Sequence, residues 1–226
     1  MPANRPSLIF DLDGTLTDSK PGIVGCLREV LNARGMKDYG SLDRFIGPPV
    51  EQWVKELLPD GSDEDRVALA RDYRACYDRV GWSNNSVYPG VTEMLAQLHG
   101  GSIPLYVCTS KHQHFAERIL ETFSIAKYFE AIFGDKIEYT SHSKSDLLAQ
   151  ILSEHEIDHE LVWMVGDRCF DIEAAHANRI RCLAAAWGYG SAEEWAQAEA
   201  VATTPDEVLG IVLTRRVASG SDVVIA

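Results

Sequence analysis

Two aspartates one residue apart follow an apolar run near the start of the chain. Asp11 and Asp13 come directly after Leu-Ile-Phe at 8–10, and in an extended chain side chains two positions apart point to the same side. Neighbouring carboxylates repel each other unless a cation lies close, and oxygen ligands suit Mg²⁺. Gly14 then allows a turn that a side chain would obstruct. The pattern predicts a magnesium site at the two aspartates, and an ordinary Asp-Gly hairpin turn is the alternative.

A second group of polar residues could bind an anion. Thr109 ends an apolar strand, and we expect Ser110 and Lys111 to open the following helix. Hydroxyls and free backbone amides at the start of a helix can bind phosphate. Lys144 opens a later helix, and its ammonium group would add positive charge to the same site. With Gly14, residues Thr109, Ser110 and Lys144 are therefore the predicted phosphate ligands. The alternatives are a helix cap and a surface lysine.

A third acidic group follows a later apolar run. Asp167 comes directly after Gly166, and Asp171 lies four positions further on. If a helical turn begins near Arg168, the two carboxylates can face one side. Asp167 would then join Asp11 as a metal ligand, and Asp171 would orient a ligand or water from behind it. Capping of the helix by Asp167 is the alternative.

Alternating strands and helices position these residues. We expect strands at 7–12, 105–109, 131–133 and 161–165, with a further apolar run at 182–186. Helical apolar spacing separates these strands, which predicts right-handed βαβ units and a parallel sheet, an α/β fold with a Rossmann-like core. In such sheets ligands bind at the carboxyl ends of the strands. The polar groups fall at these ends or at helix starts.

Residues 18–87 are predicted to be helical throughout, with no convincing strand. The third expected helix, at 63–80, carries apolar residues from Val67 to Val80. Because this helical block stands between the first strand and the rest, we interpret it as an inserted cap. Residues 1–17 and 88–226 would form the α/β core domain, and 18–87 the helical cap domain. The tail at 214–226 gives weak signals and receives no assignment.

Composition excludes several classes of protein. The chain carries 21 Lys and Arg against 34 Asp and Glu, a net charge of −13. This charge argues against nucleic-acid binding, but a bound metal can still attract small phosphorylated ligands. We find neither a signal-peptide run nor an apolar stretch of the roughly 18–20 residues that a membrane span needs. The five cysteines are spread without a CxxC pair, so we expect reduced thiols in a cytoplasmic protein. The oligomeric state stays open.

In order and spacing these motifs resemble those of the haloacid dehalogenase superfamily of phosphohydrolases. The resemblance runs from Leu8 to about Val212, and the helical block is similar to the type-one cap of that family. Within the superfamily, residues 45–49, 109–111, 165–168 and 188–191 resemble the phosphoglycolate phosphatase and 5′-nucleotidase-like branch. Two positions depart from it. Ser145 stands where relatives often carry proline, and Ser110 where many phosphoglycolate phosphatases carry asparagine.

The resemblance implies a two-step phosphoryl transfer. Asp11 would attack the phosphorus and form an aspartyl-phosphate, while Asp13 would protonate the leaving oxygen and then activate water. Mg²⁺ would be held by Asp11, Asp167 and the backbone carbonyl of Asp13, and Thr109 and Lys144 would hold the phosphoryl oxygens. Dehalogenases of this superfamily lack the second aspartate, so Asp13 favours phosphate chemistry.

The sequence therefore predicts a Mg²⁺-dependent phosphatase acting on 2-phosphoglycolate or a nucleoside 5′-monophosphate. Two alternatives are a non-catalytic binding or regulatory protein on the same scaffold and a sugar-phosphate mutase that uses the same aspartyl-phosphate. The cap would close over the core and exclude water. Arg44 and Phe45, beside Gly-Pro-Pro at 47–49, are the expected substrate-facing residues of the cap. A surface charge and hinge packing are the alternatives for these two.

Overall fold

A parallel six-stranded sheet forms the centre of the structure, a computed structural model that describes residues 6–136 and 143–217. In spatial order the strands are β5 (Ala131–Asp135), β4 (Leu105–His112), β1 (Ser7–Phe10), β6 (Val162–Gly166), β7 (Arg181–Ala185) and β8 (Ala200–Ala202). The predicted α/β fold is confirmed. The chain builds outward from β1 to β5 on one side and then returns to build β6 to β8 on the other. Such a reversal leaves a crevice at the carboxyl end of β1, where ligands bind in open parallel sheets.

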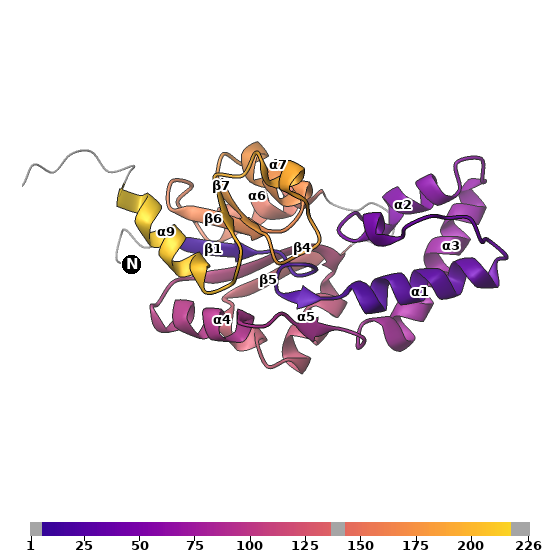
Figure 1. The fold of residues 1–226 in the computed structure, drawn as a ribbon, viewed down its shortest axis with the longest axis horizontal. Coiled ribbons are helices and arrows are strands. Elements are labelled where there is room, and N and C mark those ends of the chain that lie inside the picture. The colour runs from indigo at the N-terminus through magenta and orange to yellow at the C-terminus, as the bar shows by residue number, and fades with distance from the viewer. Residues whose placement is uncertain (1–5, 137–142, 218–226) are drawn as a thin grey trace, which may run out of the picture.

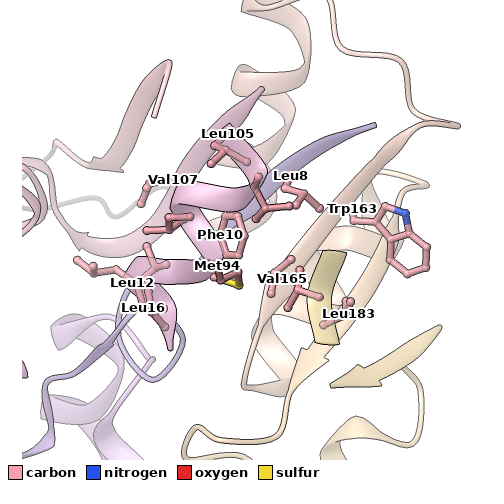
Figure 2. Close-up of a cluster of buried hydrophobic side chains, with 14 of the residues drawn as sticks. Leu8, Phe10, Leu12, Leu16, Met94, Leu105, Val107, Trp163, Val165 and Leu183 are labelled. Atoms are coloured by element: carbon pink, nitrogen blue, oxygen red, sulfur yellow. The ribbon is translucent and has the colours of Figure 1, made fainter. Parts of the chain in front are cut away.

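Helices cover both faces of this sheet (Figure 1). One face carries α4 (Val91–Gly100), α5 (Gln113–Thr122) and α9 (Glu207–Val217), and the other carries α6 (Lys144–Glu154) and α7 (Cys169–Ala177). Side chains alternate between the two faces along β1, because Leu8 and Phe10 pack on the first side and Ile9 on the second. Figure 2 shows Leu8 and Phe10 within the first cluster, beside Met94. The strand is buried on both faces, which explains its continuous apolar sequence.

The helical block, residues 18–87, lies beyond the end of the sheet (Figure 1). It contains α1 (Lys20–Ala33), η1 (Asp43–Phe45), α2 (Val50–Leu57) and α3 (Asp63–Cys76). These helices share a buried apolar cluster of their own, in which the rings of Trp53 and Tyr73 meet edge to face at 5.0 Å. A separate core supports the predicted division into core and cap domains, which stays a prediction. Residues 1–5, 137–142 and 218–226 of the predicted core domain lie outside the described residues.

Two short strands join the helical block to the sheet domain. β2 (Thr17–Asp18) and β3 (Ser86–Val87) pair in antiparallel orientation, so the prediction that 18–87 holds no strand was wrong. Two-residue strands are too short to leave an alternating pattern in the sequence. The pair ties together the two chain segments that enter and leave the block, close to the boundaries predicted at 17/18 and 87/88.

The third helix of the block ends earlier than predicted. α3 stops at Cys76, and η2 (Tyr77–Gly81) continues the chain as a turn of π-helix. The extra residue in that turn shifts the helical phase, which leaves Val80 41% exposed although it was expected on the apolar face. Val67, also expected on that face, is 55% exposed. Gly81 fits the tight turn because a Cβ there would lie 2.8 Å from the sulfur of Cys26.

The C-terminal part adds elements that the apolar pattern did not indicate. They are η3 (Ala126–Tyr128), α8 (Ala192–Trp195) and the edge strand β8. α9 covers 214–217, the beginning of the tail left unassigned from sequence, and the rest of that tail lies outside the described residues. In the two ranges that the structure describes, no helix combines the length and apolar character needed to cross a membrane.

Candidate active site

The predicted site residues meet at one edge of the sheet. Asp11 follows β1, Thr109 lies in β4, Asp167 follows β6, and Lys144 is the first residue of α6. The three strands are parallel neighbours, so their carboxyl ends share this edge. β1 lies between β4 and β6 and brings Asp11 to the centre of the group.

Three buried carboxylates lie within reach of one cation. Asp11, Asp167 and Asp171 each place an oxygen within 4.8 Å of the other two. Their exposed fractions are 4%, 0% and 1%. Asp171, predicted to act from behind the ligands, thus contributes an oxygen to the same group. An all-oxygen set of this kind suits a hard divalent cation such as Mg²⁺.

Lys144 supplies the positive charge nearest to these carboxylates. Its ammonium nitrogen lies 2.6 Å from Oδ1 of Asp11 and 2.6 Å from Oδ1 of Asp171. The start of α6 is fixed by Ser143, whose hydroxyl accepts a hydrogen bond from the amide of Asp146 at 3.1 Å. Burial lowers the pKa of Lys144, but Asp11 and Asp171 outweigh burial and hold it above its usual value. The lysine therefore stays charged inside the site.

One lysine does not neutralise the acidic group. Burial raises the pKa of Asp11 to about 7, Asp171 and Asp13 add to the rise, and Lys144 opposes it. Burial also raises the pKa of Asp167 well above its usual value, and Asp171 and Asp11 add to that shift. Both shifts mean that the ionised carboxylates are costly without a further cation. The donor set and its charge therefore fit a bound divalent metal.

Glycines allow the backbone to close tightly around Asp167. Gly14 has a φ of +95°, and a Cβ at this position would collide with the Asp167 carboxylate. A Cβ at Gly188 would also collide, lying 2.6 Å from Oδ2 of Asp167. The amide of Tyr189 donates a hydrogen bond to that same oxygen at 2.7 Å. The turn at Gly14 and the segment at 188–189 thus both pack against one acidic side chain.

The chain after Thr109 is a bulged strand rather than the start of a helix. β4 continues to His112 and α5 begins at Gln113, so the prediction that Ser110 and Lys111 open the helix was wrong. The register between β4 and β5 shifts within this segment. A bulge re-aims side chains that regular alternation would send to fixed faces. Ser110 then lies in the wall of a cavity, without the helix-start amides expected around it.

Asp13 has one oxygen held and one oxygen without a partner. Its Oδ2 lies 3.0 Å from the ammonium nitrogen of Lys111, and the two side chains are 11% and 6% exposed. Oδ1 is buried and has no hydrogen-bond partner among the described residues. The Thr109 hydroxyl accepts a hydrogen bond from the Lys111 amide at 3.2 Å, which orients the threonine oxygen. Asp13 lines the cavity, so a ligand bound in that cavity would lie beside this side chain.

A cavity of about 670 Å³ lies between the helical block and this edge of the sheet. Phe45, Trp53 and Tyr77 from the block contribute to its wall together with Asp13 and Lys111. The wall also includes Ser110, Phe115, Arg71 and Arg74. The structure therefore brings Phe45, one of the two predicted cap residues, to the space where a substrate would bind.

Arg44, the other predicted cap residue, points elsewhere. It is exposed, and its Nε lies 2.6 Å from Oε1 of Glu56. Its guanidinium lies 4.3 Å from the ring centroid of Phe45 and covers that ring. The structure thus leaves Arg44 outside the described cavity wall.

Sequence reasoning assigned no role in the site to Lys111 or Tyr77. The only available signal for Lys111 was its position in the polar run after a strand. Tyr77 carries no such signal, because its placement depends on the π-helical turn of η2. Tyr189 also went unassigned, although Gly-Tyr-Gly at 188–190 marks a turn.

A known protein family matches this chain, and the match includes the motifs described above. The family model for haloacid dehalogenase-like hydrolases matches residues 8–185, which include all the predicted site residues. The chain belongs to this family. The resemblance inferred from the motifs is thereby confirmed, and the family membership explains the parallel sheet with a helical block after its first strand.

Individual relatives carry several names. The chain is 39% identical over 196 residues to tyrosine-protein kinase PtkA of Mycobacterium tuberculosis, covering 85% of this chain and 66% of that protein, just under two thirds of its length. It is 35% identical over 192 residues to a 5′-nucleotidase of Pseudomonas aeruginosa, covering 84% and 86%. The crystal structure of a predicted phosphatase from Clostridium acetobutylicum aligns with a TM-score of 0.86 at 31% identity, covering 93% of this chain and all of that one.

Proposed function

We propose that the protein is a Mg²⁺-dependent phosphatase that hydrolyses a small phosphomonoester through an aspartyl-phosphate on Asp11. The observation that carries the proposal is the buried group of Asp11, Asp167 and Asp171 with Lys144. Asp13, two positions after Asp11 in the chain, lines the neighbouring cavity. A phosphoryl group needs positive charge on its oxygens, a nucleophile in line and an acid for the leaving group. Residues suited to each task are present.

Asp11, Asp167 and the backbone carbonyl of Asp13 are the proposed metal ligands, with Asp171 adjoining them. When bound, Mg²⁺ would neutralise the carboxylates and the phosphate oxygens, which lets two anions approach each other. Lys144, the hydroxyls of Thr109 and Ser110, and the backbone turn at Gly14 would hold the phosphoryl oxygens. These assignments draw support from the raised pKa values of Asp11 and Asp167, because burial and neighbouring carboxylates make both ionised groups costly and a bound cation would offset that cost.

The proposed reaction has two steps. In the first, an oxygen of Asp11 forms a bond to phosphorus while the bond from phosphorus to the leaving oxygen breaks, and Asp13 gives its proton to that oxygen. In the second, Asp13 takes a proton from water as the water oxygen attacks the phosphorus, which releases phosphate and restores the Asp11 carboxylate. Every proton that Asp13 gives is regained, so the enzyme ends unchanged.

The cavity favours a nucleoside 5′-monophosphate over 2-phosphoglycolate. Its volume of about 670 Å³ lies within the range of about 300–1,000 Å³ typical of small-molecule sites. A two-carbon leaving group would leave most of that space to water, whereas a nucleoside would contact the aromatic wall at Phe45 and Trp53. The relative named 5′-nucleotidase agrees with this choice.

The five cysteines are free thiols, four of them buried, which supports a reducing compartment, and we propose the cytoplasm. The proposed partner is a small phosphorylated metabolite. The net charge of −13 supports the proposal that no nucleic-acid polymer binds.

A phosphate-release screen with purified protein tests the function. With Mg²⁺ present, we expect hydrolysis of p-nitrophenyl phosphate and, with a higher kcat/KM, of nucleoside 5′-monophosphates. EDTA should stop the reaction, and Asp11→Asn should abolish turnover while the circular dichroism spectrum stays unchanged. Asp60→Asn, in an exposed turn of the helical block, is the matched control and should retain activity.

Other outcomes of the screen separate the alternatives. Isomerised hexose phosphate without free phosphate would identify a mutase. Transfer of phosphate from ATP to a tyrosine peptide, the activity in the name of the PtkA relatives, would replace hydrolysis as the main reaction. Failure on every phosphomonoester would favour a non-catalytic binding protein. Appreciable activity in pure Asp11→Asn would contradict the nucleophile assignment.

A further inference from the structure

Lys111 connects the aspartate proposed as the acid and base to a tyrosine of the helical block. Its ammonium nitrogen lies 3.0 Å from Oδ2 of Asp13 and donates a hydrogen bond to the hydroxyl of Tyr77 at 2.6 Å. The lysine side chain is 6% exposed, so water does not compete for these contacts. Burial lowers the pKa of Lys111, but Asp13 and Tyr77 outweigh burial and hold it above its usual value. A charged lysine thus joins residues from two parts of the fold.

The bulge in β4 places Lys111 against Asp13. Cys108 pairs with Phe133 and His112 with Asp135, so β4 carries extra residues between two positions that are close together on β5. Gly134 permits this close approach, since a Cβ there would lie 2.6 Å from the carbonyl oxygen of Lys111.

Gln113 fastens the bulge to β5. Its Oε1 accepts a hydrogen bond from the amide of Gly134 at 2.6 Å. Its Nε2 donates to the carbonyl of Ile132 at 2.8 Å. Both ends of the side-chain amide therefore bond to the neighbouring strand, which ties the end of the bulge to β5.

The π-helical turn places Tyr77 against the lysine. Tyr77 begins η2 and is 4% exposed. Its ring packs edge to face on Phe115 of α5 at 5.2 Å. The tyrosine therefore belongs to the helical block but packs on the sheet domain, where its hydroxyl accepts the hydrogen bond from Lys111.

We propose that Lys111, held by Tyr77, positions Asp13 so that Oδ1 carries the proton that is given to the leaving group. This inference rests on the proposed phosphatase function. The Lys111 ammonium donates to Oδ2, so that oxygen acts as an acceptor. A positive charge beside Oδ2 disfavours a proton on that oxygen, which makes Oδ1 the favoured site for a proton on Asp13. Oδ1 is the oxygen without a partner, and Asp13 lines the cavity.

The chemical step needs no further reactant. As the bond from phosphorus to the leaving oxygen breaks and the bond to Asp11 forms, the proton moves from Oδ1 of Asp13 to the leaving oxygen. Lys111 keeps its own protons and acts only on the position of the carboxyl group. Loss of Lys111 would let Asp13 rotate, and a small misplacement of a reacting group lowers the rate strongly. The effect should be large only when the leaving group needs a proton.

A pair of substrates of nearly equal size tests this role. Phenyl phosphate releases a basic phenolate that requires protonation, whereas p-nitrophenyl phosphate releases an anion stabilised by its nitro group. The kcat/KM values depend on the steps up to departure of the leaving group and not on the later attack by water, so their ratio compares that departure for the two substrates. We expect Lys111→Met to lower kcat/KM about 100-fold for phenyl phosphate and less than about tenfold for p-nitrophenyl phosphate. Tyr77→Phe, which keeps the ring, should shift the ratio about threefold in the same direction.

Matched controls separate positioning from a general loss of structure. Lys127 lies over the ring of Tyr128 at 5.1 Å, outside the site, so Lys127→Met and Tyr128→Phe remove the same groups from another lysine–tyrosine pair and should leave the ratio unchanged. In an Asp13→Asn background, Lys111→Met should cause no further change in the ratio, because the lysine acts through Asp13. Lys111→Arg keeps a charged donor, so its ratio of kcat/KM values should lie between those of Lys111→Met and the unmodified protein.

The outcomes distinguish this inference from the proposed function. If Asp11→Asn is inactive but Lys111→Met and Tyr77→Phe slow both substrates equally, the phosphatase function stands and the positioning role is wrong. If the unmodified protein hydrolyses neither substrate with Mg²⁺, the proposed function fails and the inference falls with it.

Discussion

The ammonium nitrogen of Lys144 lies 2.6 Å from Oδ1 of Asp11, although 133 positions separate the two residues in the chain. Their side chains are 8% and 6% exposed. Exposed ion pairs contribute little to stability because water screens them. A buried pair differs, because removal of one partner leaves the other charge without compensation. Lys144 therefore stabilises the metal-free fold in addition to its proposed contact with phosphate.

Replacement of this lysine should expose that contribution. We expect Lys144→Met to lower the free energy of unfolding of the metal-free protein by about 3 kcal/mol, measured by urea denaturation in EDTA. Mg²⁺ should restore more stability to the variant than to the unmodified protein, because no other cation then neutralises Asp11. Lys20→Met removes an exposed pair with Asp43 at 2.7 Å and should change stability by less than about 1 kcal/mol. Equal stability of the two variants would contradict the assignment.

The cluster of buried aspartates should make the stability of the metal-free protein depend on pH. Burial raises the pKa of Asp11 from the usual 3.8 to about 7. Between these values the folded state keeps a proton that the unfolded chain releases. Stability therefore falls as pH rises through this window. Thermal unfolding in EDTA, followed from pH 4.5 to 7.5, should show this decline.

Mg²⁺ should reverse that trend, because metal ligands must be deprotonated to bind. The rise in melting temperature on adding Mg²⁺ should be larger at pH 8 than at pH 5.5. Asp11→Asn removes one of the two carboxyl groups with a raised pKa and should make the metal-free profile less steep. A profile in EDTA that rises with pH from 4.5 to 7.5 would contradict the raised pKa of Asp11.

The close approach at Gly14 predicts a specific cost for one added methyl group. Gly14→Ala would strain the backbone at a φ of +95° and press on the Asp167 carboxylate. We expect a loss of about 1–3 kcal/mol in stability and weaker activation by Mg²⁺, measured by titrating Mg²⁺ against activity. Gly25→Ala is the control, because Gly25 is helical and a Cβ there has no neighbour within 4 Å. That change should stabilise the protein by about 0.5–1 kcal/mol.

The sheet and the acidic group could be predicted because each depends on local pattern. Apolar runs of strand length are followed by polar residues at positions 11, 109 and 167, and parallel strands must bring these positions to one edge. Lys144 could also be placed from local pattern, because Ser143 caps α6 and Lys144 is the first residue of that helix. The length of the apolar runs was enough to locate the strands, even though β4 continues past its apolar run to His112.

The contacts of Lys111 and Tyr77 could not be predicted because they depend on two irregularities. One is the bulge in β4, and the other is the π-helical turn after α3. Each adds residues to a regular element and so changes which side of that element a residue faces. Gly134, a glycine inside a strand, was the single local signal of the bulge, since such glycines often mark close backbone approach.

The two predicted cap residues should differ in their effect on substrate binding. Phe45 is 2% exposed, lines the cavity and packs against Trp53 with ring centroids 5.9 Å apart. Arg44 is exposed and pairs with Glu56 outside the cavity wall. We expect Phe45→Leu to raise KM several-fold for a nucleoside 5′-monophosphate, because the smaller side chain loses contact with the leaving group, at a stability cost of about 1–2 kcal/mol. Arg44→Gln removes a surface charge outside the cavity wall and should change KM less than about twofold, because exposed charge pairs contribute little. Steady-state kinetics on both variants measures the two KM values. A larger increase in KM from Arg44→Gln than from Phe45→Leu would place the substrate against the outer face of the helical block instead of inside the cavity.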